Sequence, residues 1–199
     1  MAGKKGTKVV DKWKSKKWYA ILAPQSFEYK QIGEVVSSDE ANLINRVVKV
    51  SLFELGTTSA TSQIAMFTNL FFRITGVNGN NANTKLIGHE ISPSFIKTFA
   101  RRGKSVIHQV VKVKTKDGEG LSIKVIAVTG SKVSENTKRN IRNSLVEEIK
   151  KDSAEKTFDE LMQDIIYGRF SSKLFNRLKQ ITEMKRVEVR KTEREEAFK

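Results

Sequence analysis

Three lysines stand at alternate positions in the run of residues 106–116, which is otherwise rich in β-branched side chains. Successive side chains of a strand point to opposite faces, so Lys112, Lys114 and Lys116 share one face at intervals of about 7 Å. Ammonium groups are not buried without partners. We call these residues the lysine row and expect it to be exposed, with the opposite face of the strand in the core through Ile107, Val111 and Val113. Fixed ammonium groups in a row can neutralise the phosphates of a polyanion.

A hairpin holds the lysine row in place. The loop Lys116–Gly120 contains Asp117-Gly118, a strong short-range hairpin signal, and a second β-branched run follows over residues 121–128. The lysines are therefore predicted to project from a rigid strand.

The net charge of +15 over 199 residues is concentrated in three windows. Residues 1–18 carry +6, residues 101–116 carry +6 and residues 138–151 carry +3, which leaves the rest of the chain neutral. Clustered positive charge is typical of nucleic-acid binding. The alternative is a basic chain that its charge only keeps soluble.

The first window is predicted to be an extended binding arm over residues 1–17, because it is too poor in apolar residues to fold alone. Trp13 lies among its lysines and can either stack on an unpaired base or dock on the core. In the second window, Arg101 and Arg102 are predicted to lie in the last turn of a helix that begins at Ser92-Pro93 and ends before Gly103. They serve the helix dipole and, with Lys104 beside them, phosphate contact as well.

In the third window, a helix of about 16 residues is predicted from Ser134 by the spacing of Ile141, Leu145 and Ile149. Its bases come in the first half and Glu147 and Glu148 in the second, the reverse of what the helix dipole favours. We interpret this order as a sign that the basic end has a use in binding.

The predicted class is α+β. We expect an antiparallel β-barrel-like core of about seven strands, a helix before the central hairpin, and a C-terminal helical segment packed alongside over residues 134–180. Residues 18–191 are predicted to form a single globular domain and residues 192–199 a charged tail.

Residues for other chemistry are scarce. The chain has no cysteine and two histidines, His89 and His108, without a set of acidic ligands at metal-binding spacing. We interpret both as strand residues rather than catalytic bases, and no triad or phosphate-loop motif occurs. The sequence therefore predicts no enzyme, no metal and no cofactor, and no signal peptide or membrane span.

Several strings resemble one family in their order along nearly the whole chain. This small-subunit ribosomal protein family of archaea and eukaryotes is called S-three-A-e (also eS-one), and the length resembles its archaeal form. The similar strings are Lys17-Trp18-Tyr19, Ala23-Pro24, Ile32-Gly33, residues 45–52, residues 113–118, Ile141-Arg142 and residues 187–191.

The resemblance implies a barrel with flanking helices, no enzymatic activity and no cofactor. It implies a cytoplasmic, ribosomal location on the platform of the small subunit, near the messenger exit and the 3′ end of the subunit RNA. The implied partners are small-subunit ribosomal RNA, neighbouring platform proteins and messenger RNA, with no membrane and no small-molecule substrate. The alternatives are an RNA-processing enzyme or RNA chaperone that uses the same surface, and a protein that packs DNA.

The RNA contacts that we predict follow from charge placement alone. The candidate residues are Lys4, Lys5, Lys8, Lys12, Trp13, Lys14, Lys16, Lys17, Arg101, Arg102, Lys104, Lys112, Lys114, Lys116, Lys138, Arg139 and Arg142.

Overall fold

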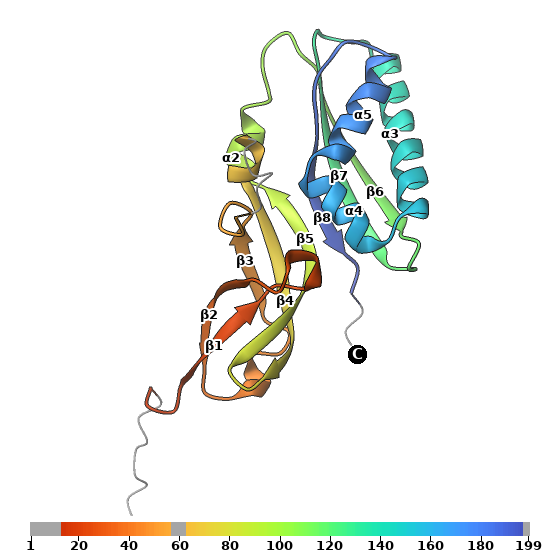
Figure 1. The fold of residues 1–199 in the computed structure, drawn as a ribbon. Helices are drawn as coiled ribbons and strands as arrows, with labels where there is room; N and C mark the ends of the chain where they lie inside the picture. Colours follow the sequence, from red (N-terminus) through yellow and green to blue (C-terminus); the bar gives the residue numbers. More distant parts are fainter. Residues whose placement is uncertain (1–12, 57–62, 197–199) are drawn as a thin grey trace, which may run out of the picture. The chain divides into compact units, whose positions relative to one another are not determined.

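The computed structural model describes residues 13–56 and 63–196, and it confirms the α+β class (Figure 1). Its strands are β1 (Lys17–Leu22), β2 (Gln31–Ser37), β3 (Val47–Ser51), β4 (Thr68–Asn78), β5 (Asn81–Ile91), β6 (Val106–Lys114), β7 (Gly120–Thr129) and β8 (Met184–Arg194). Its α-helices are α1 (Gln63–Met66), α2 (Pro93–Lys97), α3 (Glu135–Glu155), α4 (Phe158–Ile166) and α5 (Arg169–Lys179).

The chain divides into two compact units. The described parts of Met1–Val48 and Arg73–Lys85 form the first, and those of Lys49–Phe72 and Leu86–Lys199 form the second. Strands β4 and β5 contribute residues to both units, so the two share a continuous hairpin. The expectation of one globular domain over residues 18–191 stays a prediction.

The first unit is built around β1, which pairs antiparallel with β2 and parallel with the start of β5. Its core contains Tyr19, Leu43, Ile74 and Ala82, each at most 2% exposed. These residues come from both parts of the chain that make the unit, so its core forms only when the β4–β5 hairpin folds back onto β1.

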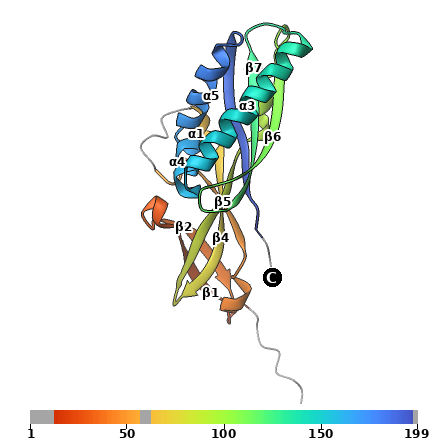
Figure 2. The same cartoon turned by 90° about the vertical axis from the view of Figure 1, so that its right-hand side faces the viewer.

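In the second unit, β8 lies between β7 and the end of β5, and β7 pairs in turn with β6. The approach of β5 to β8 requires a glycine, because a Cβ on Gly88 would lie 2.1 Å from the Thr192 carbonyl oxygen. Helices α3, α4 and α5 cover one face of β6, β7 and β8, as the two views show (Figures 1 and 2).

The predicted barrel closure was wrong. The eight described strands form an open sheet, in which β6 pairs only with β7 and β2 only with β1. A barrel needs its first and last strands to pair. The sheet forms because β8, from the far end of the chain, inserts between β5 and β7, and strand count alone does not reveal such an order.

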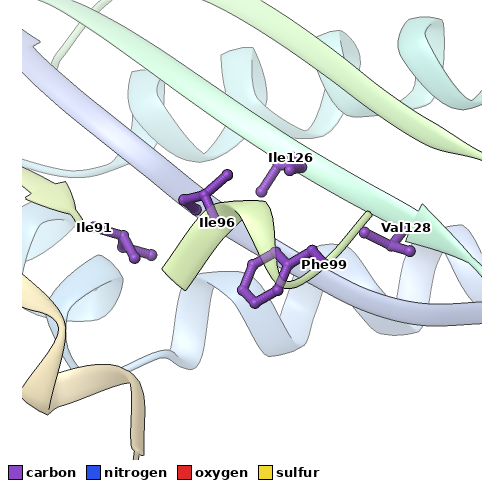
Figure 3. Packing of buried hydrophobic residues seen from close by; sticks show 5 residues of the cluster. All are labelled: Ile91, Ile96, Phe99, Ile126 and Val128. Carbon is purple, nitrogen blue, oxygen red and sulfur yellow. The ribbon is translucent and has the colours of Figure 1, made fainter. Parts of the chain in front are cut away.

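Helix α2 packs on the second unit through a small apolar cluster (Figure 3). Ile96 and Phe99 lie against Ile126 and Val128 of β7, together with Ile91 at the end of β5. Ser92 and Pro93 begin this helix as predicted, but the helix already ends at Lys97. Arg101 and Arg102 therefore lie beyond its last turn, where the helix dipole has little effect.

Helix α3 is longer than predicted, with 21 residues, and the Ser134 side chain accepts a hydrogen bond from the Thr137 amide. The acids in its second half bind α5. Glu148 lies 3.3 Å from the Arg177 guanidinium, and the buried Asp152 accepts a hydrogen bond from the Lys173 ammonium. The late positions of Glu148 and Asp152 thus have a structural reason, whereas Glu147 is exposed, and the first turn carries its own acid, Glu135.

A capping box begins α4, where Thr157 and Glu160 stand three positions apart in the sequence. The Glu160 amide donates to the Thr157 hydroxyl, and the Thr157 amide donates to the Glu160 carboxylate. The tip of the β6–β7 hairpin adds a third contact, because the Phe158 amide donates to the Asp117 carboxylate at 3.1 Å. The hairpin tip is therefore fixed against the start of α4.

His89 of β5 is buried, and both of its ring nitrogens have partners. Nε2 lies 3.0 Å from the Val189 carbonyl oxygen and Nδ1 lies 2.8 Å from the Thr192 hydroxyl. A carbonyl can only accept, so Nε2 carries the proton and Nδ1 accepts from Thr192. Burial lowers the pKa of His89 to about 4, despite the opposing effect of the Val189 hydrogen bond. His89 is thus a neutral core residue that joins β5 to β8.

Replacement of Lys173 by alanine is expected to lower the free energy of unfolding by about 3 kcal/mol, because it leaves the buried Asp152 carboxylate without its partner. Asp152→Asn is the matched change, and its cost should be clearly smaller, since the half-exposed Lys173 ammonium then turns to water. Urea denaturation of both variants measures the difference. Equal losses would show that burial of the carboxylate does not govern this pair.

The stability of the protein is expected to fall as the pH drops from about 6.5 to about 4. Over this interval the unfolded chain protonates His89 while the native protein keeps it neutral, which amounts to about 3 kcal/mol in total. Urea midpoints across this pH range should show a shallower dependence for His89→Gln than for the native sequence. His108→Gln changes an exposed histidine and is the control; an equal slope in all three proteins would contradict the assignment.

Candidate nucleic-acid interface

The lysine row lies on the open face of β6, as predicted. Lys112, Lys114 and Lys116 are exposed, whereas Ile107, Val111 and Val113 are at most 8% exposed on the face that α3 covers. The hairpin register runs from Val106↔Val128 to Lys114↔Gly120, so all nine residues of β6 pair with β7. This ladder fixes the directions of the first two lysines, and Lys116 follows in the turn.

Acidic side chains compensate part of the positive charge on this face of the sheet, including that of Lys112. Lys112 lies 3.4 Å from the Glu195 carboxylate, and both side chains are largely exposed, so this ion pair is weak and open to exchange with another anion. Further across the sheet, Glu193 contacts Lys124 at 2.8 Å and Lys191 at 2.7 Å. The hydrogen bonds that Lys124 and Lys191 donate lower the pKa of Glu193. The same bond to Glu193 raises the pKa of Lys191. The uncompensated charge on this face is therefore concentrated along β6.

The second predicted group follows α2. Arg101 and Arg102 are exposed, and Lys104 is half-buried beside Lys185, the second residue of β8. The side-chain interaction with Lys185 holds the pKa of Lys104 below its usual range, and burial acts in the same direction. Since Arg101 and Arg102 lie beyond the helix, a role at the helix end has no support, and their contact with phosphate stays a prediction.

The basic half of α3 differs from its prediction in one respect. Lys138 forms an ion pair of 2.5 Å with Glu135, and this hydrogen bond lowers the pKa of Glu135. Arg142 is half-buried near the same carboxylate, and Arg139 is exposed. One acid thus reduces the charge of this end, and Arg139 is its most accessible base.

The order of the strands brings two of these groups to one end of the second unit. The Ser105 hydroxyl accepts from the Val133 amide just before α3, and the Gly130 amide donates to Glu183 just before β8. Residues 101–104, the start of α3 and Lys185 therefore lie at this end. The lysine row lies at the other end of β6, where the Lys116 amide donates to Lys156 at the end of α3.

The described part of the predicted arm belongs to the first unit. Lys14, Lys16 and Lys17 are exposed, and Trp13 is 67% exposed with the Lys16 ammonium 4.1 Å from its ring centre. Trp13 therefore does not dock on the core, and its ring stays accessible for stacking. Lys4, Lys5, Lys8 and Lys12 lie outside the described residues.

Sequence reasoning missed Lys185 and Arg186 at the start of β8. The available signal was an adjacent pair of bases just before an alternating apolar run. Its value depends on the pairing of β8 with β7, which brings both residues close to Arg101 and Lys104 from a distance of about eighty positions in the chain.

A basic surface on an α+β fold is typical of a protein that binds nucleic acid. Within the residues that the structure describes, no helix is both long enough and apolar enough to cross a membrane.

Comparison with known proteins identifies the family. A model of the Ribosomal S3Ae family matches residues 4–197. The small ribosomal subunit protein eS1 of Sulfurisphaera tokodaii is 36% identical over 186 residues, which cover 94% of this chain and 94% of that protein. The eS1 proteins of Saccharolobus islandicus and Methanococcus maripaludis are 34% and 35% identical, over 96% and 95% of this chain and 90% and 83% of those proteins.

The chain belongs to the Ribosomal S3Ae family. It is a ribosomal protein of archaeal length and not an enzyme, as the sequence predicted.

Proposed function

We propose that this chain is a structural constituent of the small ribosomal subunit and that it binds ribosomal RNA through the positive groups of its two units. The single observation that carries this proposal is the lysine row. Lys112 and Lys114 project from a strand that is paired along its whole length and packed under α3, and Lys116 follows in the turn. Such a row presents its charges without further ordering of the backbone.

The physical mechanism is neutralisation of phosphates with release of counterions. Exposed ammonium and guanidinium groups on fixed strands and loops match the shape of a folded RNA rather than the edges of particular bases. Trp13 adds a ring on which an unpaired base can stack. RNA is then contacted at four places: the arm, the lysine row, the residues after α2 and the start of α3.

The finer parts of the proposal concern place and partners. We propose a position on the platform near the messenger exit, in a cytoplasmic ribosome, with other platform proteins and messenger RNA as neighbours. The exposed apolar side chains Phe53, Met66 and Phe67 in the second unit are suited to contact with such neighbours.

The alternative of an RNA-processing enzyme or RNA chaperone has no support from the relatives. Of its two candidate bases, His89 is buried with both ring nitrogens engaged, which leaves it no means of reaching a substrate, whereas His108 is exposed on β6.

A tagged copy of this chain, expressed in an archaeal host, is expected to sediment with the small ribosomal subunit at moderate salt. Immunodetection across a sucrose gradient makes the measurement, and an unrelated basic protein of similar charge is the control. Recovery only at the top of the gradient would contradict a role in the subunit. Recovery with the chromosome instead would favour a protein that packs DNA.

Replacement of Lys112, Lys114 and Lys116 together by glutamine is expected to flatten the plot of log affinity against log salt by roughly two units, since each lost phosphate contact removes about 0.7–0.9. The measurement is binding of small-subunit RNA over a series of salt concentrations. The variant Lys150→Gln, Lys151→Gln, Lys179→Gln removes the same charge from exposed helix positions. Equal flattening in both variants would exclude the lysine row as a specific contact.

A further inference from the structure

A cavity of about 260 Å³ lies between the segment that follows α2 and the start of β8. Its six lining residues all belong to the second unit, and three of them are basic: Arg101, Lys185 and Arg186. The other three, Thr98, Phe99 and Val128, form a wall that is mostly apolar. Arg101 and Lys185 are exposed to water, and the apolar wall strengthens the attraction of these bases for an anion on its side of the cavity.

Lys104 adds a fourth base at this place. The side chains of Lys104 and Lys185 interact, and both are ammonium groups in water. This interaction and burial lower the pKa of Lys104, and Glu183 opposes them. Two like charges that the fold holds together are unfavourable unless a third group compensates them.

Arg186 is held by aromatic rings at the wall of the cavity. Its guanidinium carbon lies 4.8 Å from the ring centre of Phe99 and 5.7 Å from that of Phe95, and the two rings meet edge to face at 5.1 Å. Glu188 approaches its Nε only to 4.0 Å. The stacked guanidinium is thus oriented in advance and keeps donors for a further acceptor.

The size of the cavity limits its ligand. Binding sites for drug-sized molecules begin at about 300 Å³ and enclose most of the ligand, so this site fits a smaller group. Four bases against two nearby acids, Glu183 and Glu188, favour an anion with several acceptor oxygens. A phosphate group has both the size and the acceptors.

We propose that this cavity binds one backbone phosphate of ribosomal RNA between Arg101, Lys104, Lys185 and Arg186, an inference that rests on the RNA-binding role proposed above. The phosphate compensates the repulsion between the two lysines and accepts hydrogen bonds from the two arginines. This site explains why the fold brings Lys104 and Lys185 together, and it extends the interface to β8.

The test is Lys185→Gln. This variant should bind small-subunit RNA about tenfold more weakly, with a salt slope smaller by about 0.7–0.9, because one phosphate contact is lost. The thermal midpoint of the RNA-free variant at low salt should be equal to or higher than that of the native protein, because a repulsion is removed. Weaker RNA binding together with a lower midpoint would indicate a structural role and overturn the proposal.

Lys104→Gln and the double variant supply a second measurement. Since both lysines contact the same phosphate, the loss of affinity in the double variant should be clearly smaller than the product of the two single losses. Independent losses would overturn a shared phosphate. The matched control is Lys151→Gln, an exposed lysine on α3 outside the cavity, which should change the affinity less than threefold.

Further outcomes separate a soluble anion from RNA as the source of the phosphate, and the failure of the cavity proposal from that of the proposed function. Sodium pyrophosphate at millimolar concentration should raise the thermal midpoint of the native protein more than that of Lys185→Gln. If it does so while both proteins bind RNA equally well, the cavity binds a soluble anion and the RNA site is excluded. If Lys185→Gln has no effect but the lysine-row variant flattens the salt slope, the cavity proposal fails and the proposed function stands. If the native protein shows no salt-dependent RNA binding, the proposed function itself fails.

Discussion

The strict alternation of side chains along β6 is the constraint on which the second unit depends. Every second residue enters the core beneath α3, so the residues between must face away from it. A shift of one position in register would expose Ile107 and Val111 and bury the lysine row, at a large cost in both directions. The packing that stabilises the hairpin and the charge that the hairpin presents are therefore consequences of one register.

The basic residues of this protein fall into two groups, those in ion pairs between helices and those with few acidic neighbours. The bases of α5 lie against acids of α3 and α4, as in Arg177 with Glu148 and Arg169 with Asp164, and these pairs hold the helical layer together. The bases that follow α2 and those of β6 have few acidic neighbours and remain available for a partner. The acids Glu148 and Asp152 in the second half of α3 pair with bases of the first group, and this explains their late positions, which the helix dipole does not favour.

The closely spaced Lys104 and Lys185 illustrate how a binding site limits stability. A fold selected only for stability would separate two ammonium groups at this distance, whereas a site for phosphate requires them to be close. The Phe99 ring also favours binding, because it orients the Arg186 guanidinium, which then loses less conformational freedom when it binds an anion. Both features support the proposed phosphate site at the start of β8, next to the apolar cluster that fixes α2.

The sequence by itself determined the α+β class, the β6–β7 hairpin with its lysine row, the start of α2 at Ser92-Pro93 and the capping box of α4. These features depend on residues that are close in the chain, and their physics is local: alternation, turn geometry and helix capping. Only the tertiary structure decided the open sheet, the buried His89, the partners of the α3 acids and the cavity at Lys185. The open sheet, the burial of His89 and the cavity depend on the insertion of β8 between β5 and β7, which pairs residues 55 to 105 positions apart, and the α3 acids depend on the packing of α5. No local pattern specifies these long-range contacts.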